Sequence, residues 1–224
     1  MPPGMMSLLG ATYGMELIYS FLIIAVCLII YFETKQIYRL SSHKGIKYFR
    51  YTFLFFAISY LLKFISRLFL IDNATNPNSL FLLVLLIFTT YSYLMAGIYL
   101  VLSISWKKKK AGFLNKTWLW HIFAILVVFI TIFTRFPVVY ILSQTIIFVY
   151  ALVLLSFRRR KLNKKETSLV HIIYPSLLVF WILNILDLFI SNFLIGVQIL
   201  IYLFSTGLFL SILYKVIKRI NTRR

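Results

Sequence analysis

The stretch "YTFLFFAISYLLKFISRLFLI", residues 51–71, decides the fold class. An α-helix rises 1.5 Å per residue, so about 20 apolar residues cross the roughly 30 Å hydrocarbon core of a bilayer. The only charged side chains in the stretch are Lys63 and Arg67, one helical turn apart. We therefore predict a transmembrane helix that holds two cations at membrane depth, where charged groups usually mark a structural tie or a functional site.

The composition extends this prediction to the whole chain. Hydrophobic residues make up 62% of the 224 residues, and the mean hydropathy is +0.93. Such values are typical of an all-α, polytopic integral membrane protein. We predict one seven-helix transmembrane domain and no soluble domain. The expected spans are residues 15–32, 51–71, 80–104, 118–133, 138–157, 169–190 and 193–214.

The basic residues predict the orientation. Of the 24 Lys and Arg residues, 21 lie after the first, third and fifth spans or in the C-terminal tail, and the other connectors hold only Arg135. The positive-inside rule then places the N-terminus outside and the C-terminus in the cytoplasm, as in a multi-pass protein of the cell membrane. The basic runs are expected to contact anionic lipid headgroups, and this distribution argues against nucleic-acid binding.

The acidic residues argue against an enzyme. No HExxH or GxSxG motif is present, and the three histidines lie on different segments, so we expect no catalytic residue, bound metal or cofactor. The span boundaries are accurate to a few residues, so Glu16 falls at the edge of the first span and, of the five acidic residues, only Asp187 is expected well within one. The five are Glu16, Glu33, Asp72, Glu166 and Asp187.

The two cations of the second span have counterparts on the sixth. By the helical rise, Arg67 lies about 6 Å and Lys63 about 12 Å below the outer boundary, while Asp187 and Asn184 lie at about 5 and 9 Å. We predict an ion pair between Arg67 and Asp187, with Lys63 near Asn184. Two interpretations remain open, a salt bridge that ties helices together and a ligand site built on the same residues.

Other polar residues gather in the outer halves of the spans, whereas the inner halves are mostly apolar. This asymmetry predicts an outward-facing polar pocket for a small anionic or zwitterionic ligand. The candidate ligand-binding residues are Lys63, Arg67, Gln144, Asn184, Asp187, Gln198 and Tyr202.

Two short internal matches indicate a 3+1+3 parallel repeat. "SRLFL" (66–70) aligns with "LDLFI" (186–190), and "AGIYLVLS" (96–103) with "TGLFLSIL" (206–213). The arrangement resembles SWEET-type sugar facilitators, although the first span lacks the proline of that family. The orientation is similar to that of microbial rhodopsins, but the last span has no lysine before Lys215, which disfavours a retinal Schiff base.

Three function classes follow. The favoured one is a receptor or sensor whose pocket binds the ligand at Lys63 and Arg67 and passes a helix shift to a cytoplasmic or membrane protein partner. The second is a SWEET-like facilitator of a small polar solute. The third is a scaffold subunit of a membrane complex. The receptor is favoured because the polar residues stop halfway, whereas a transport pathway is expected to continue inward.

Overall fold

The chain forms a bundle of seven α-helices in the computed structural model, which describes residues 3–72, 79–105, 117–134, 137–159, 164–190 and 195–221. No strand occurs in these ranges, so the predicted all-α fold class is confirmed. The helices are α1 (Pro3–Ser41), α2 (Lys44–Asp72), α3 (Ser79–Ser105), α4 (Thr117–Thr134), α5 (Pro137–Arg159), α6 (Lys164–Ile190) and α7 (Ile195–Asn221).

The helices match the predicted segments but extend beyond the apolar residues. The α1 helix starts far before residue 15 and continues past residue 32, and α2 begins ahead of residue 51. A helix need not end where its apolar residues end, because its backbone hydrogen bonds are satisfied within the segment. Ser42, with φ of 49°, ends α1, and its amide donates to the Tyr38 carbonyl at 2.8 Å. The predicted start of the last span, Phe193, lies outside the described residues.

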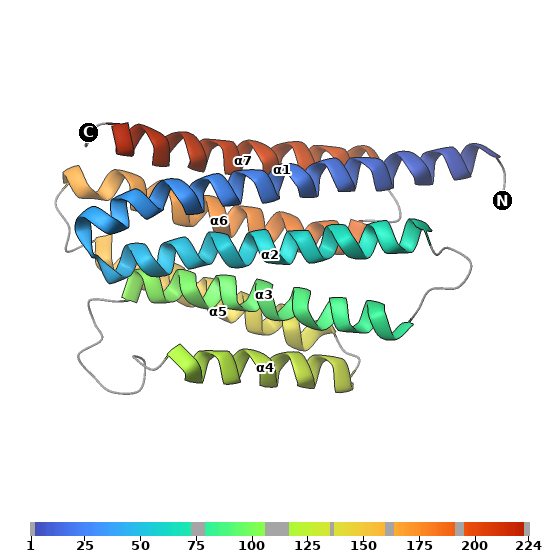
Figure 1. Cartoon of the computed structure of the whole chain (residues 1–224), viewed down its shortest axis with the longest axis horizontal. Coiled ribbons are helices and arrows are strands. Elements are labelled where there is room, and N and C mark those ends of the chain that lie inside the picture. The colour runs from blue at the N-terminus through green and yellow to red at the C-terminus, as the bar shows by residue number, and fades with distance from the viewer. Residues whose placement is uncertain are drawn as a thin grey trace.

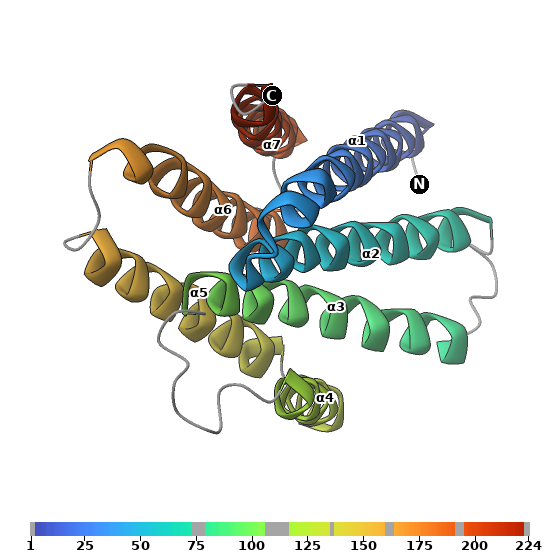
Figure 2. The same cartoon turned by 60° about the vertical axis from the view of Figure 1, so that its left-hand side comes forward.

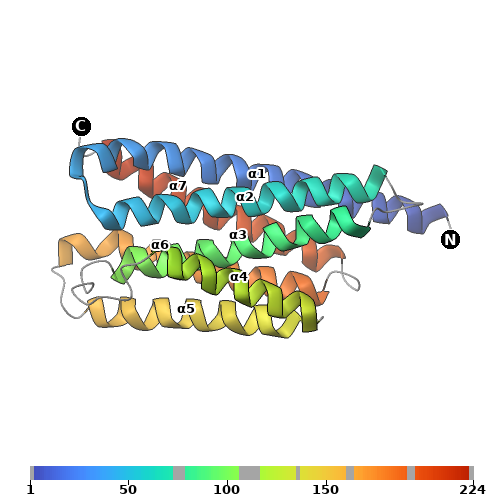
Figure 3. The same ribbon diagram turned by 60° about the horizontal axis from the view of Figure 1, so that its bottom comes forward.

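The helices run roughly parallel to the long axis of the molecule, with successive helices pointing in opposite directions (Figure 1). The α2 helix packs between α1 and α3, and α1 also contacts α7 (Figure 2). The α4 helix lies at one edge of the bundle in Figure 1, and it packs on α3 and α5, in front of which it lies in Figure 3. Because α6 in turn packs against α7, the α1, α2, α6 and α7 helices are close enough to share a polar site.

Within the described residues, six helices are long and apolar enough to cross a membrane, namely α1 to α5 and α7. The α6 helix has 27 residues, and its described apolar part is Ile173–Asp187. Large apolar side chains cover the outside of the bundle, and on α4 Phe133 is 84% exposed. A bundle with this surface contacts lipid rather than water.

Aromatic rings fill the interior between α2, α6 and α7. Phe53, Phe56, Phe180 and Phe209 are all fully buried, and the centroids of the Phe180 and Phe209 rings are 4.5 Å apart. Phe53 and Phe56 each lie 6.3 Å from the Phe209 ring in edge-to-face contacts. These ring contacts pack α2 against α6 and α7 in the interior of the bundle.

We call the end where α1 and α7 finish and α2 begins the basic end. Its described cations include Arg39, Lys44, Lys47 and Lys218. Several of the basic residues expected in the connectors lie outside the described residues, namely Lys107 to Lys110, Lys116, Arg135, Arg160 and Lys161. Which end faces the cytoplasm stays a prediction.

The internal repeat also stays a prediction. The glycines that it pairs have different surroundings. A Cβ atom on Gly97 would lie 3.1 Å from the Ile147 side chain, whereas one on Gly207 would meet nothing within 4 Å.

Candidate functional site

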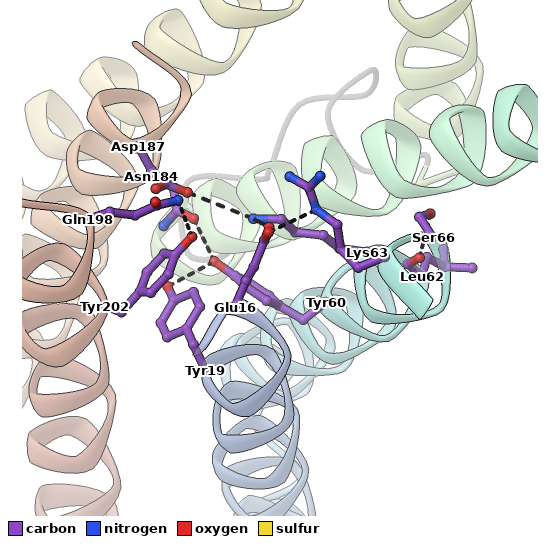
Figure 4. Close-up of polar contacts among 11 residues, drawn as sticks. Glu16, Tyr19, Tyr60, Leu62, Lys63, Ser66, Asn184, Asp187, Gln198 and Tyr202 are labelled. Carbon is purple, nitrogen blue, oxygen red and sulfur yellow. Dashed lines mark hydrogen bonds and ion pairs between the residues drawn. The ribbon is translucent and has the colours of Figure 1, made fainter. Parts of the chain in front are cut away.

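Three charged side chains meet between α1 and α2. Lys63 and Arg67 lie on one face of α2 because residues four apart are neighbours on a helix surface. Glu16 of α1 faces both cations, with Oε1 3.0 Å from Lys63 Nζ and Oε2 2.9 Å from Arg67 Nε (Figure 4 shows Glu16 and Lys63). The Glu16 side chain is 6% exposed, whereas those of Lys63 and Arg67 are 29% and 34% exposed. One buried carboxylate therefore bridges two cations that remain partly accessible.

Asp187 of α6 brings a second carboxylate to the same place. Its Oδ2 lies 3.9 Å from Lys63 Nζ, while its Oδ1 is buried and makes no described hydrogen bond within 3.5 Å, although the Gln198 and Tyr202 side chains interact with the carboxylate. Gln198 and Tyr202 of α7 lie beside it, and Gln198 Nε2 donates to the Tyr202 hydroxyl at 2.8 Å (Figure 4). We call Glu16, Lys63, Arg67 and Asp187 the charge cluster; its formal charges sum to zero.

The expected pairing of charges is wrong in detail. Among the described ion pairs, the carboxylate in contact with Arg67 is that of Glu16, and Asp187 faces Lys63 instead. The prediction rested on the similar depths of Arg67 and Asp187 below the outer boundary, but depth alone does not say which helix faces which. Because α1 lies against α2, its carboxylate reaches both cations.

Asn184 has a different partner from the expected one. The Tyr60 hydroxyl donates to Asn184 Oδ1 at 2.6 Å, and Asn184 Nδ2 donates to the Phe180 carbonyl at 2.8 Å. The Tyr60 hydroxyl also lies 3.3 Å from that of Tyr19, whose ring stacks on Tyr202 at 4.5 Å (Figure 4). A polar network beneath the charge cluster thus joins α1, α2, α6 and α7.

Gln144 takes no described part in this site. It is fully buried between α3 and α5, where its Nε2 donates to the Tyr93 carbonyl at 3.4 Å. Other polar residues from the expected pocket bond to their own helices, as Ser143 does to the Val139 carbonyl and Thr145 to the Ile141 carbonyl. Such bonds satisfy hydroxyl groups inside an apolar helix without any ligand.

Sequence reasoning missed Glu16, Tyr19 and Tyr60. Glu16 was expected at the edge of its span, but α1 begins at Pro3, so this carboxylate lies well inside a helix. A signal was present in the sequence, since Glu16 sits near the outer end of the first predicted span, as Lys63 and Arg67 sit near that of the second. An intramembrane acid and two cations at similar depths are candidates for pairing.

The charge cluster offers both kinds of partner to a ligand. Lys63 and Arg67 provide N–H donors on partly accessible side chains, and Asp187 Oδ1 is an acceptor without a described partner. Within the described ranges, no group of three or more His, Cys, Asp or Glu side chains is placed to hold a metal ion. The arrangement suits recognition of a molecule that carries charges of both signs.

Comparison with known proteins supplies one relative of undetermined role. The chain is 26% identical over 214 residues to an uncharacterized protein of Archaeoglobus fulgidus, and the alignment covers 92% of each chain. No protein-family model and no solved structure matches the chain.

Proposed function

We propose that the protein is a membrane receptor or sensor whose charge cluster binds a small zwitterionic ligand. The observation that carries the proposal is Asp187, a residue that is 8% exposed, whose Oδ2 lies 3.9 Å from the partly accessible Lys63 ammonium and whose buried Oδ1 makes no described hydrogen bond within 3.5 Å. A buried carboxylate oxygen without a partner is costly, and an ammonium group of a ligand would remove that cost. The carboxylate group of the ligand would contact Lys63 or Arg67.

A zwitterion fits this site better than an anion. Glu16 already lies within ion-pair distance of both cations, so an added anion would compete with a buried carboxylate. A ligand with both charges adds one ion pair at Asp187, while its carboxylate is met by the partly accessible ammonium group of Lys63. The role is one of binding, with no chemical step.

Lys63 offers a way to pass binding on to the helices. Its ammonium lies between Glu16 of α1 and Asp187 of α6, at 3.0 and 3.9 Å. A ligand ammonium at Asp187 would weaken the contact with Lys63 and shift α6 relative to α2. A protein partner in the cytoplasm or membrane would read that shift, because a ligand moves a conformational equilibrium only through different contacts in the two states.

The test is thermal unfolding of the detergent-purified protein with a panel of amino acids, matched carboxylates that lack the amine, and matched amines that lack the carboxylate. We expect one or more amino acids to raise Tm in proportion to the logarithm of concentration, and neither half-molecule to do so. Asp187→Asn should abolish the shift, whereas Glu33→Gln, on α1 and without a described ion pair, should keep it. A shift as large with the carboxylates alone would refute the zwitterion proposal.

A scaffold role is the second candidate, because each cation of the charge cluster already has a carboxylate within 4 Å. Under this reading the cluster only ties helices together, and Glu16→Gln lowers Tm while no compound raises it. The facilitator reading has less support. The buried rings of Phe53, Phe56, Phe180 and Phe209 fill the interior between the cluster and the basic end, so a pathway would require them to move.

A further inference from the structure

Arg50 of α2 is held against α1 at the basic end, far from the charge cluster. Its guanidinium carbon lies 4.6 Å from the centroid of the Tyr31 ring and 5.8 Å from that of Tyr38. Its Nε donates to the Tyr31 carbonyl at 3.3 Å. These contacts fix the side chain on two aromatic rings and one backbone oxygen, so its position is set before any ligand arrives.

The charge of Arg50 has no carboxylate within 4 Å in the described part of the chain, in contrast to Lys63 and Arg67. Glu33 follows Tyr31 by two residues on α1, but a step of two turns a helix by about 200°, which places it away from the face that holds Arg50. An arginine has five N–H donors, and Nε uses one of them. The four on the terminal nitrogens match the paired oxygens of a phosphate group.

The place of Arg50 along α2 fits a lipid phosphate. It lies about 9 Å from the start of α2 by the helical rise, immediately before the apolar residues 51–71. That is the boundary between the apolar span and the polar interface, where headgroups lie. Exposed cations of the same end, among them Lys35 and Lys47, favour a negatively charged lipid.

An apolar surface continues from the site toward the bilayer centre. The Phe32 ring contacts that of Tyr31, with centroids 5.4 Å apart, and the residue is 59% exposed. Ile29 lies about one turn before Phe32 on α1, farther from the basic end, and is 43% exposed. An acyl chain attached to a phosphate at Arg50 would lie along these side chains, whereas a soluble phosphate ester would make no use of them.

We propose that Arg50, Tyr31 and Tyr38 form a binding site for the phosphate group of an anionic phospholipid, with its acyl chain along Phe32 and Ile29. The tyrosine rings orient the guanidinium, and its terminal nitrogens donate to two phosphate oxygens. The site lies at the opposite end of the bundle from the charge cluster and does not depend on the receptor proposal.

The experiment is lipid titration of the full-length protein in a non-ionic detergent, with thermal unfolding as the readout. Phosphatidylglycerol, phosphatidylcholine and soluble glycerol phosphate are compared. We expect phosphatidylglycerol to raise Tm with a saturable midpoint and the other two to have no such effect. Arg50→Lys keeps the charge but loses the planar pair of donors, so the affinity for phosphatidylglycerol should fall about tenfold.

Two further variants make the test specific. Lys35→Gln removes one exposed charge from the same end and should shift the midpoint far less than Arg50→Lys does, whereas Phe32→Ala removes an exposed lipid contact and should weaken binding without unfolding the protein. Equal losses in Lys35→Gln and Arg50→Lys would overturn the proposal in favour of general electrostatics. Stabilisation by glycerol phosphate, insensitivity to Phe32→Ala, or no effect of phosphatidylglycerol would overturn it as well.

Discussion

Glu16 Oε2 lies 2.9 Å from Arg67 Nε, which joins the first two helices through an ion pair inside their apolar segments. The same carboxylate lies 3.0 Å from Lys63 through its other oxygen. One acid near the start of the chain therefore compensates two cations that would otherwise be costly at that depth. Asp187 adds a weaker contact from the far side, which makes the charge cluster a meeting point of three helices.

Glu16→Gln should destabilise the protein more than any other loss of a single acidic charge. The change leaves Lys63 and Arg67, whose side chains are 29% and 34% exposed, without their bridging carboxylate, and we expect a cost of about 1–3 kcal/mol. A fall in Tm in detergent measures the effect. Glu33→Gln, on the same helix, is the control and should change Tm little. Equal effects of the two variants would show that Glu16 has no special role.

Double-mutant cycles should rank the ion pairs by distance. We expect strong coupling between Glu16→Gln and Arg67→Gln. Coupling between Lys63→Gln and Asp187→Asn should be weaker, because the charged atoms are 3.9 Å apart. The losses from Arg67→Gln and Asp187→Asn should be nearly additive. Unfolding free energies of the single and double variants provide the measurement. Strong coupling in the last cycle would contradict the pairing described above.

Tyr60→Phe should cost about 1–2 kcal/mol. The ring is kept, but Asn184 Oδ1 loses a 2.6 Å hydrogen bond and the Tyr19 hydroxyl loses its neighbour in a buried setting. Chemical or thermal unfolding detects the loss. Tyr214→Phe serves as the matched control, since that residue is 64% exposed, and it should have no measurable effect. If both variants unfold alike, the network does not contribute to stability.

Gly97→Ala and Gly207→Ala should differ, although the internal alignment pairs these positions. The added methyl group at position 97 would crowd Ile147 at 3.1 Å and Gln144 at 3.3 Å, so we expect a loss of about 1 kcal/mol. At position 207 it would meet nothing within 4 Å, and alanine favours a helix. Tm is measured for the two variants in parallel. A larger fall in Tm for Gly207→Ala than for Gly97→Ala would be inconsistent with the packing of α3 on α5.

Helices and their membrane character follow from the sequence alone. Hydropathy is a local property, and a chain in lipid must satisfy its backbone hydrogen bonds within each segment, so residues 51–71 already predict a helix. Lys63 and Arg67 were likewise found by their presence in an apolar segment. The same holds for Asp187, because a charge at that depth is costly wherever its partner lies.

Only the tertiary structure decided which charges meet. The partner of a buried cation depends on how far each helix extends, how it is rotated and which helix lies beside it. The sequence placed Glu16 at the edge of a span, but the longer α1 helix brings it between Lys63 and Arg67. It also matched Gln144 to the site by depth, whereas the packing of α5 on α3 places that side chain against Tyr93. The depth of a residue in the membrane follows from its own segment, whereas a contact between side chains depends on how two helices pack.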